Sequence, residues 1–185
     1  MDFYLASASP RRFQLLSLLD YQFCQVNGQI DESVHPEEDA VAYVQRMALE
    51  KAIAGQQNAP ESLPVLGADT TISYCGSILG KPKDEVDSIR MLSLLSGQTH
   101  QVLTAVAVVC GGIQQQCLVT TDVTMRTIST AEMKDYWNSG EPVDKAGSYA
   151  IQGIGGKFIT SIHGSYSSVV GLPLVESESL LKRFL

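Results

Sequence analysis

A serine- and arginine-rich turn near the N-terminus has the residue types of an anion-binding site. Residues 7–12 read Ser-Ala-Ser-Pro-Arg-Arg and lie between an apolar run expected to form a strand and a segment expected to form a helix. Ser9 is suited to cap that helix and Pro10 to begin it, because proline at the first helical position costs no hydrogen bond. Free N–H groups and the guanidinium groups of Arg11 and Arg12 would converge there, which predicts a phosphate site.

The alternative for these two arginines is a solvated helix face. Arginine in the first turn opposes the helix dipole, so a purely structural design would use Asp or Glu there. We therefore favour the phosphate interpretation. The turn lacks the glycine pattern of a Walker or dinucleotide-binding loop, so by itself it indicates no standard nucleotide-binding class.

A lysine is expected on the buried face of the next helix. Lys51 continues the apolar face of a helix predicted over residues 36–54, where Val41, Val44 and Ala48 precede it. A lysine on a buried face needs a counter-charge, unless its ammonium group reaches solvent from the edge of that face. The sequence leaves both possibilities open.

Two acidic residues are the best candidates for holding a divalent cation. Asp69 follows a short apolar strand predicted over residues 64–68, where an acid is poorly suited to a core and well suited to a cleft, although it could instead cap a turn. Glu32 lies in a polar loop over residues 29–36. Both offer the hard oxygen ligands that Mg²⁺ prefers.

The composition favours a small anionic ligand over nucleic acid or a membrane. The chain has 185 residues, 44% of them hydrophobic, and a formal net charge of −7. Proteins that grip the nucleic-acid backbone are usually basic, so a basic pocket in an acidic protein fits a small anion better. The longest apolar run, residues 102–110, is too short to span a membrane. With no secretory leader and no CxxC spacing, we expect a cytoplasmic protein with reduced cysteines.

The other segments predict an alternation of helices and strands without an internal repeat. The expected strands are residues 3–6, 22–26, 64–68, 99–110, 116–128, 158–162 and 167–170, and the expected helices are residues 10–19, 36–54, 84–96, 129–139 and 173–184. Gly111 and Gly112 predict a hairpin. His100 is expected to be structural, because no nucleophile accompanies it. Glycine-rich residues 141–156 suit a backbone that approaches a ligand, a flexible loop being the alternative.

Seven short motifs, taken in order, resemble those of the Maf-like nucleotide pyrophosphatases and cover nearly the whole chain. The motifs are Ser7–Arg12, Gly67–Thr70, Gly80–Pro82, Ser96–His100, Asp144–Gly147, Ser165–Tyr166 and Val170–Pro173. Arg11, Thr70 and Ile151–Gln152–Gly153 resemble the subgroup that hydrolyses dTTP and UTP, rather than the subgroup acting on methylated GTP.

The resemblance implies a Maf/ITPase-like α/β fold in a single domain over residues 1–185. This fold is an elongated, strongly twisted mixed sheet flanked by helices, in two lobes with a nucleotide-binding cleft between them. It also implies hydrolysis between the α- and β-phosphates with Mg²⁺ or Mn²⁺, giving a nucleoside monophosphate and pyrophosphate. Family members often form homodimers, and some were linked to arrest of septum formation. A non-catalytic nucleotide-binding regulator of division is therefore the alternative. A phosphotransferase is disfavoured because no kinase glycine loop is found.

By the same resemblance, each candidate residue takes a role toward the nucleotide. Asp69 is the proton acceptor that activates water and, with Glu32, a metal ligand. The phosphates fall to Ser7, Arg12, Lys51 and Lys81, and base specificity falls to Arg11, Thr70 and Gln152. No pair of nucleophile and base is evident, so direct attack of water on the α-phosphorus is expected.

Two of these side chains could distinguish the pyrimidine bases. Gln152 can donate to a carbonyl of uracil or thymine and accept from N3–H, although it could also flip to suit cytosine. Arg11 only donates, so it would find no acceptor at the N4 amino group of cytosine.

Overall fold

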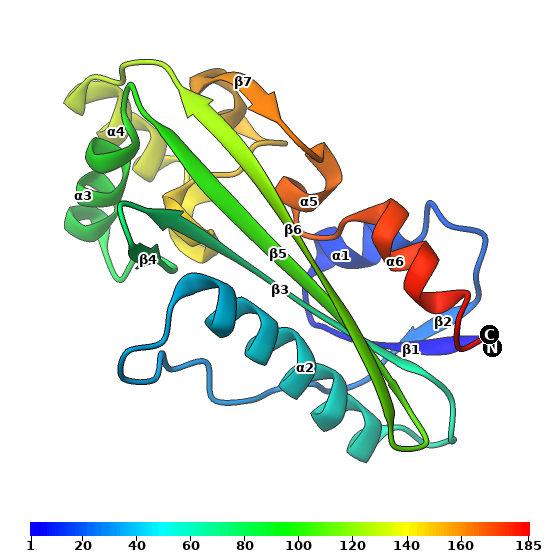
Figure 1. The fold of residues 1–185 in the computed structure, drawn as a ribbon. Helices are drawn as coiled ribbons and strands as arrows, with labels where there is room; N and C mark the ends of the chain where they lie inside the picture. The colour runs from blue at the N-terminus through cyan, green and yellow to red at the C-terminus, as the bar shows by residue number, and fades with distance from the viewer.

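A seven-stranded mixed sheet runs the length of the molecule. The computed structural model describes residues 1–185, and its strands follow the order β2-β1-β3-β5-β6-β7, with β4 paired to β3 outside that path (Figure 1). The strands are β1 (Phe3–Ala6), β2 (Phe23–Gln25), β3 (Val65–Tyr74), β4 (Ser77–Leu79), β5 (Thr99–Cys110), β6 (Ile113–Met125) and β7 (Ile159–His163). Strands β2, β1 and β3 pair in parallel, and the other pairs are antiparallel. The expected elongated mixed sheet is confirmed.

Strand β3 has a gap in its pairing near its middle. Its first residues pair with β1 as far as Gly67, and pairing with β4 begins only at Ile72. Between these points, residues 68–71 pair with β5 alone. Asp69 thus lies inside a ten-residue strand, and the prediction that it follows the end of a strand is wrong. The apolar run stops at Asp69, within the stretch that has only one neighbouring strand.

Helices cover both faces of the sheet. They are α1 (Pro10–Leu16), α2 (Ala40–Asn58), α3 (Glu85–Leu95), α4 (Thr130–Asn138), α5 (Tyr166–Val170) and α6 (Leu174–Leu181), with short 3₁₀ helices at Glu141–Asp144, Ala146–Ser148 and Ile154–Phe158. Figure 1 shows α2 on one side of the long strands and α1 and α6 on the other, with α3 and α4 at the far end. No helix combines the length and the apolar character needed to cross a membrane.

The hydrophobic core is divided in a way that produces two lobes. One cluster lies where α3 and α4 pack on the far ends of β3, β5 and β6, and includes Leu92, Met125 and Phe158. At the other end, one cluster joins α1 and α6 to the sheet, and a second cluster joins α2 to its opposite face. The three long strands β3, β5 and β6 connect the two lobes, as the resemblance implied.

Several local sequence signals form the predicted structures. The Ser129 side chain accepts from the backbone N–H of Glu132, whose carboxylate accepts from the backbone N–H of Ser129, so the capping box of α4 is present. Gly111 and Gly112 have φ values of 55° and 84°, which gives the tight β5–β6 hairpin its left-handed turn. These signals succeed because each depends on residues only a few positions apart.

Two predicted elements are corrected by the structure. Residues 167–170, predicted as a strand, belong to α5, because the Ser165 side chain accepts from the backbone N–H of Ser168 and starts a helical turn. Helix α2 begins at Ala40 rather than at residue 36, because Asp39 caps it. The buried residues of α2 are Val44, Met47, Ala48, Lys51, Ala52 and Gly55, whereas Val41 is exposed.

Candidate active site

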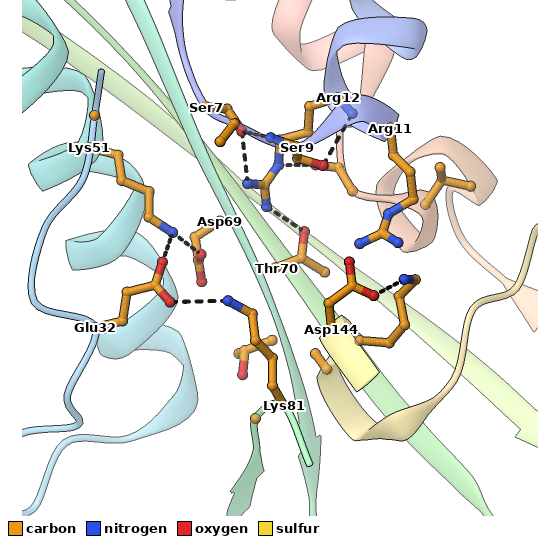
Figure 2. Close-up of a pocket in the computed structure, with 18 of the residues that line it drawn as sticks. Ser7, Ser9, Arg11, Arg12, Glu32, Lys51, Asp69, Thr70, Lys81 and Asp144 are labelled. Atoms are coloured by element: carbon orange, nitrogen blue, oxygen red, sulfur yellow. Dashed lines mark hydrogen bonds and ion pairs between the residues drawn. The ribbon is translucent and has the colours of Figure 1, made fainter. Parts of the chain in front are cut away.

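A large cleft between the two lobes brings the predicted site residues together. Its volume is ≈ 1420 Å³, and its walls come from the N-terminal turn, the loop before α2, the middle of β3 and the segment after α4. All the residues predicted for the site line it: Ser7, Arg11, Arg12, Glu32, Lys51, Asp69, Thr70, Lys81 and Gln152. Figure 2 shows most of these side chains converging from both sides.

The centre of the cleft is a lysine held between two carboxylates. The Nζ atom of Lys51 lies 2.7 Å from Oε1 of Glu32 and 2.7 Å from Oδ1 of Asp69 (Figure 2). Lys51 and Asp69 are 9% and 8% exposed, so this part of the cluster is largely withdrawn from water. The Nζ of Lys81 lies 3.4 Å from the other oxygen of Glu32, and its side chain is mostly exposed. Lys51 is therefore paired with two carboxylates, and its ammonium group does not extend into solvent from the edge of the helix face.

Close packing of a helix on a strand fixes this lysine–carboxylate spacing. Lys51 lies on α2 and Asp69 on β3, and the two elements meet at Gly67. A Cβ atom on Gly67 would collide with the backbone of Ala48 and Ala52, which flank Lys51 along α2. The absence of a side chain at Gly67 lets the ammonium group reach the carboxylate directly.

The charge balance keeps Glu32 ionised. Burial acts to raise the pKa of Glu32, but hydrogen bonding to Lys51 and the charges of Lys51 and Lys81 outweigh it and lower that pKa. The loop that carries Glu32 is itself tied to α2, because the Tyr43 hydroxyl donates to the Glu32 carbonyl oxygen at 3.0 Å. The guanidinium of Arg46 also donates to the Ser33 carbonyl oxygen, at 3.0 Å.

The second cationic group of the cleft is Arg12. Its Nε donates to the Gly171 carbonyl oxygen at 2.9 Å, and Nη2 donates to the Thr70 hydroxyl at 3.3 Å. Nη1 lies 3.5 Å from Oγ of Ser7, which also accepts from the backbone N–H of Ser9 at 3.2 Å. Burial lowers the pKa of Arg12, opposed by the charge of Asp69. The guanidinium is thus fixed at the helix start, as a phosphate site requires.

Thr70 has a contact that the sequence did not indicate. Its hydroxyl accepts from Arg12 and lies 3.0 Å from the hydroxyl of Thr104 on β5. Thr104 in turn donates to the Ser168 carbonyl oxygen at 2.8 Å. Thr70 therefore holds Arg12 in place while it lines the cleft.

Two charged residues that line the cleft after α4, Asp144 and Lys145, were not among the predicted site residues. Figure 2 shows Arg11 extending across the cleft toward Asp144, which accepts a hydrogen bond from Lys145. That hydrogen bond lowers the pKa of Asp144, burial opposes the shift, and the charges of Lys145 and Arg11 reinforce it. Asp144 and Lys145 begin one of the motifs that resemble the family, but the approach of Arg11 to Asp144 joins residues far apart in the chain.

Gln152 and His100 occupy different environments. Gln152 lies exposed at the wall of the cleft, on the turn before the last 3₁₀ helix. His100 is buried, with Nε2 2.7 Å from the hydroxyl of Tyr149, and burial lowers its pKa to about 4. A neutral, buried histidine that does not line the cleft agrees with the expected structural role.

The donor atoms of the cleft fit a divalent cation that shares its coordination with a substrate. Glu32 and Asp69 supply carboxylate oxygens on either side of one ammonium group. The protein has no group of three or more His, Cys, Asp and Glu side chains that could hold an ion alone. Mg²⁺ is commonly bound by one or two carboxylates together with phosphate oxygens and water, so two carboxylates beside a phosphate site are a suitable set.

The fold and the cleft together define an α/β protein built to bind a phosphorylated ligand between two lobes. The family model described as "Maf-like protein" matches residues 2–184, and the chain belongs to this family.

Curated relatives cover nearly the whole chain. A protein of Yersinia pestis bv. Antiqua named "dTTP/UTP pyrophosphatase" is 53% identical over 182 residues, which is 98% of this chain and 92% of that protein. A protein of Photobacterium profundum with the same name is 51% identical over 191 residues, covering 100% of this chain and 97% of the relative. A solved structure from Mycobacterium abscessus, described as a nucleoside-triphosphatase / dITP/XTP pyrophosphatase, has a TM-score of 0.43 and 16% identity over 68% of this chain and 73% of its own.

Proposed function

We propose that the chain is a nucleoside triphosphate pyrophosphatase that hydrolyses dTTP and UTP to the nucleoside monophosphate and pyrophosphate. The observation that carries this proposal is the buried Asp69 beside Lys51 and Glu32, in a cleft that also holds Arg12. Relatives that share about half of its residues and nearly its full length are named dTTP/UTP pyrophosphatases.

The phosphate chain is bound by cations from three elements. Arg12 and the start of α1 offer a guanidinium and free N–H groups, with the Ser7 hydroxyl beside them. Lys51 and Lys81 offer ammonium groups from α2 and from the loop after β4. Arginine offers bidentate geometry to phosphate oxygens, and each lysine adds a compact point charge.

Asp69 is the proton acceptor in this mechanism. Its carboxylate lines the cleft at the unpaired edge of β3, beside Lys51, one of the cations proposed to bind the phosphate chain. It takes a proton from a water molecule as the water attacks the α-phosphorus, and pyrophosphate leaves. No Ser or Cys with an adjacent base lines the cleft, which favours direct attack over a covalent intermediate.

Glu32 and Asp69 would hold Mg²⁺ or Mn²⁺ together with phosphate oxygens. The bound cation would neutralise charge that develops on the phosphates during the reaction. Lys51, which lies between the two carboxylates, would then turn toward the phosphate chain.

The first prediction concerns the products. A panel of nucleoside triphosphates, analysed by phosphorus NMR, should give equal amounts of monophosphate and pyrophosphate from UTP and dTTP. Release of orthophosphate and a diphosphate would place attack at the γ-phosphorus and contradict the proposal. Tight nucleotide binding without any product would instead support the alternative, a non-catalytic regulator of septum formation.

The second prediction concerns base selection by Arg11. A donor facing the N4 amino group of cytosine leaves an unpaired polar contact that costs about 1–3 kcal/mol, roughly 10- to 100-fold in kcat/KM. The Arg11→Ala variant should therefore narrow the gap between UTP and CTP while lowering overall activity. The 5-methyl group of thymine is worth only about 1 kcal/mol, so dTTP and UTP should be used alike.

Steady-state kcat/KM values for UTP, dTTP, CTP and GTP test this model of the base site. Arg90→Ala is a suitable control, because Arg90 is an exposed residue of α3 that pairs with Asp87 outside the cleft. Equal use of CTP and UTP by the wild type would refute the assigned role of Arg11, although hydrolysis at the α-phosphorus could still be correct.

The compartment, the domain boundaries and the assembly state are separate proposals, which rest on the composition and on the family resemblance. We expect a cytoplasmic enzyme that forms a single domain over residues 1–185 and assembles as a homodimer. Sedimentation at several protein concentrations, with and without UTP, measures the assembly state.

A further inference from the structure

A partly buried carboxylate outside the cleft holds the turn that carries Gln152. Glu141 follows α4 and accepts three hydrogen bonds. The Tyr136 hydroxyl donates to Oε1 at 2.6 Å, and the backbone N–H groups of Ile154 and Gly155 donate to Oε2 at 2.8 Å and to Oε1 at 2.9 Å. Neither Glu141 nor Tyr136 lines the cleft. These contacts fix the residues that follow Gln152.

The Tyr136 hydroxyl holds the other side of the same turn. It accepts from the backbone N–H of Ala150 at 3.1 Å, in addition to donating to Glu141. The Tyr136 ring is 1% exposed and packs edge-on against Phe158, with ring centroids 5.2 Å apart. Ala150 is thereby tied to Tyr136 on α4, and Ile154 and Gly155 are tied to Glu141, which is itself bonded to Tyr136.

The glycines of this turn make room for that arrangement. A Cβ atom on Gly153 would collide with the Glu141 carboxylate, and a Cβ atom on Gly155 would collide with the Tyr136 hydroxyl. The sequence suggested that glycine at this density lets the backbone approach a ligand. For these two positions, the structure shows that the backbone approaches Glu141 and Tyr136 instead.

The protonation states of Glu141 and Tyr136 fix the direction of the hydrogen bond between them. Burial acts to raise the pKa of Glu141, but hydrogen bonds from Tyr136 and from two backbone N–H groups outweigh it and lower that pKa. Burial, followed by the hydrogen bond to Glu141, raises the pKa of Tyr136. At neutral pH the carboxylate only accepts, and the phenol remains a donor to it.

We propose that Glu141 and Tyr136 are positioning residues for base selection, because they hold the 150–155 turn so that Gln152 stays at the wall of the cleft. The inference rests on the proposed function, since Gln152 is assigned to the pyrimidine base there. It assigns no contact with the nucleotide to either residue. Their effect on selectivity passes through Gln152.

The Glu141→Gln variant is the direct test. A glutamine side chain keeps the size of Glu141 but places an NH₂ group against a backbone N–H donor, so one contact to the turn is lost. We expect the ratio of kcat/KM for UTP to that for CTP to fall about tenfold. The loss should appear mainly in KM for UTP, because the catalytic centre at Asp69 is untouched. Tyr136→Phe, which keeps the ring packing, should act in the same direction.

Glu132→Gln, on the helix that carries Tyr136, is the matched control. Glu132 also accepts several hydrogen bonds, from the Ser129 backbone and from Arg126, but it lies at the other end of α4. This variant should lower the melting temperature and leave the UTP-to-CTP ratio unchanged. If Glu141 had a purely structural role, Glu141→Gln would likewise lower the melting temperature and leave the UTP-to-CTP ratio unchanged.

A double-mutant cycle separates positioning from general destabilisation. In a Gln152→Ala background, Glu141→Gln should cause no further loss of selectivity, because the residue that it positions has been removed. An unchanged UTP-to-CTP ratio in folded Glu141→Gln, or an equal loss in both backgrounds, would overturn the inference. Should Glu141→Gln not fold, the same cycle with Tyr136→Phe decides. Absence of pyrophosphate release by the wild type would instead contradict the proposed function.

Discussion

Replacement of Asp69 by asparagine is expected to lower kcat for UTP by about 10²–10⁴-fold, the usual cost of losing a general base. Asparagine keeps the shape of the side chain at the open edge of β3 and cannot accept the proton from water. Glu32 still pairs with Lys51 at 2.7 Å, so the ammonium group keeps a counter-charge and the fold should survive. Nucleotide binding, measured by calorimetry, should therefore change far less than turnover.

An exposed aspartate supplies the control for this variant. Asp135 lies on the outer side of α4, and Asp135→Asn removes the same charge from the protein without touching the cleft. It should retain wild-type kcat. A folded Asp69→Asn protein that turns over UTP at a near wild-type rate would show that another group accepts the proton.

Replacement of Lys51 by alanine is expected to reduce both stability and activity. Removing one partner of a buried ion pair leaves the other charge uncompensated, which typically costs about 3–5 kcal/mol of unfolding free energy. Without Lys51 the buried charge of Asp69 would be uncompensated, whereas Glu32 is half exposed and can be solvated. We therefore expect a loss of unfolding free energy near the lower end of this range. Urea unfolding measures the loss, and kcat/KM for UTP measures the phosphate contact.

Lys81→Ala separates the two effects of lysine removal. Lys81 is 61% exposed and lies 3.4 Å from Glu32, so its ion pair is a surface one worth about 1 kcal/mol or less. This variant should lose activity while its unfolding free energy stays nearly constant. A Lys51→Ala protein as stable as the wild type would contradict the ion-pair argument, and unchanged activity would contradict the phosphate role.

The sequence predicted those parts of the fold that depend on neighbouring residues. The cap of α1 by Ser9, the capping box of α4 and the β5–β6 hairpin each use residues a few positions apart. Helix α5 was missed because its 5 residues are too few to show helical periodicity, and its serine cap resembles a turn.

Motifs in the sequence predicted the residues of the candidate site, but they did not predict the contacts among those residues. Arg12 donates to Gly171, which is 159 positions away, and no local pattern encodes such a contact. Asp69 was placed after a strand because the apolar run stops there, whereas the strand continues and only its pairing to β1 ends. The role of Glu141 was hidden because the glycines that face it also fit a ligand-binding loop.

The firm attachment of β3 to its neighbours has a consequence for how this enzyme can evolve. The residue proposed for the chemistry stands on a strand that is paired to β5 along its length and pressed against α2 at Gly67. Two of the three residues proposed to select the base, Arg11 and Gln152, stand on the first turn of α1 and on the 150–155 turn, outside the sheet, and only Thr70 shares β3 with Asp69. Libraries confined to those two turns can alter base preference while Asp69 and its surroundings on β3 are kept.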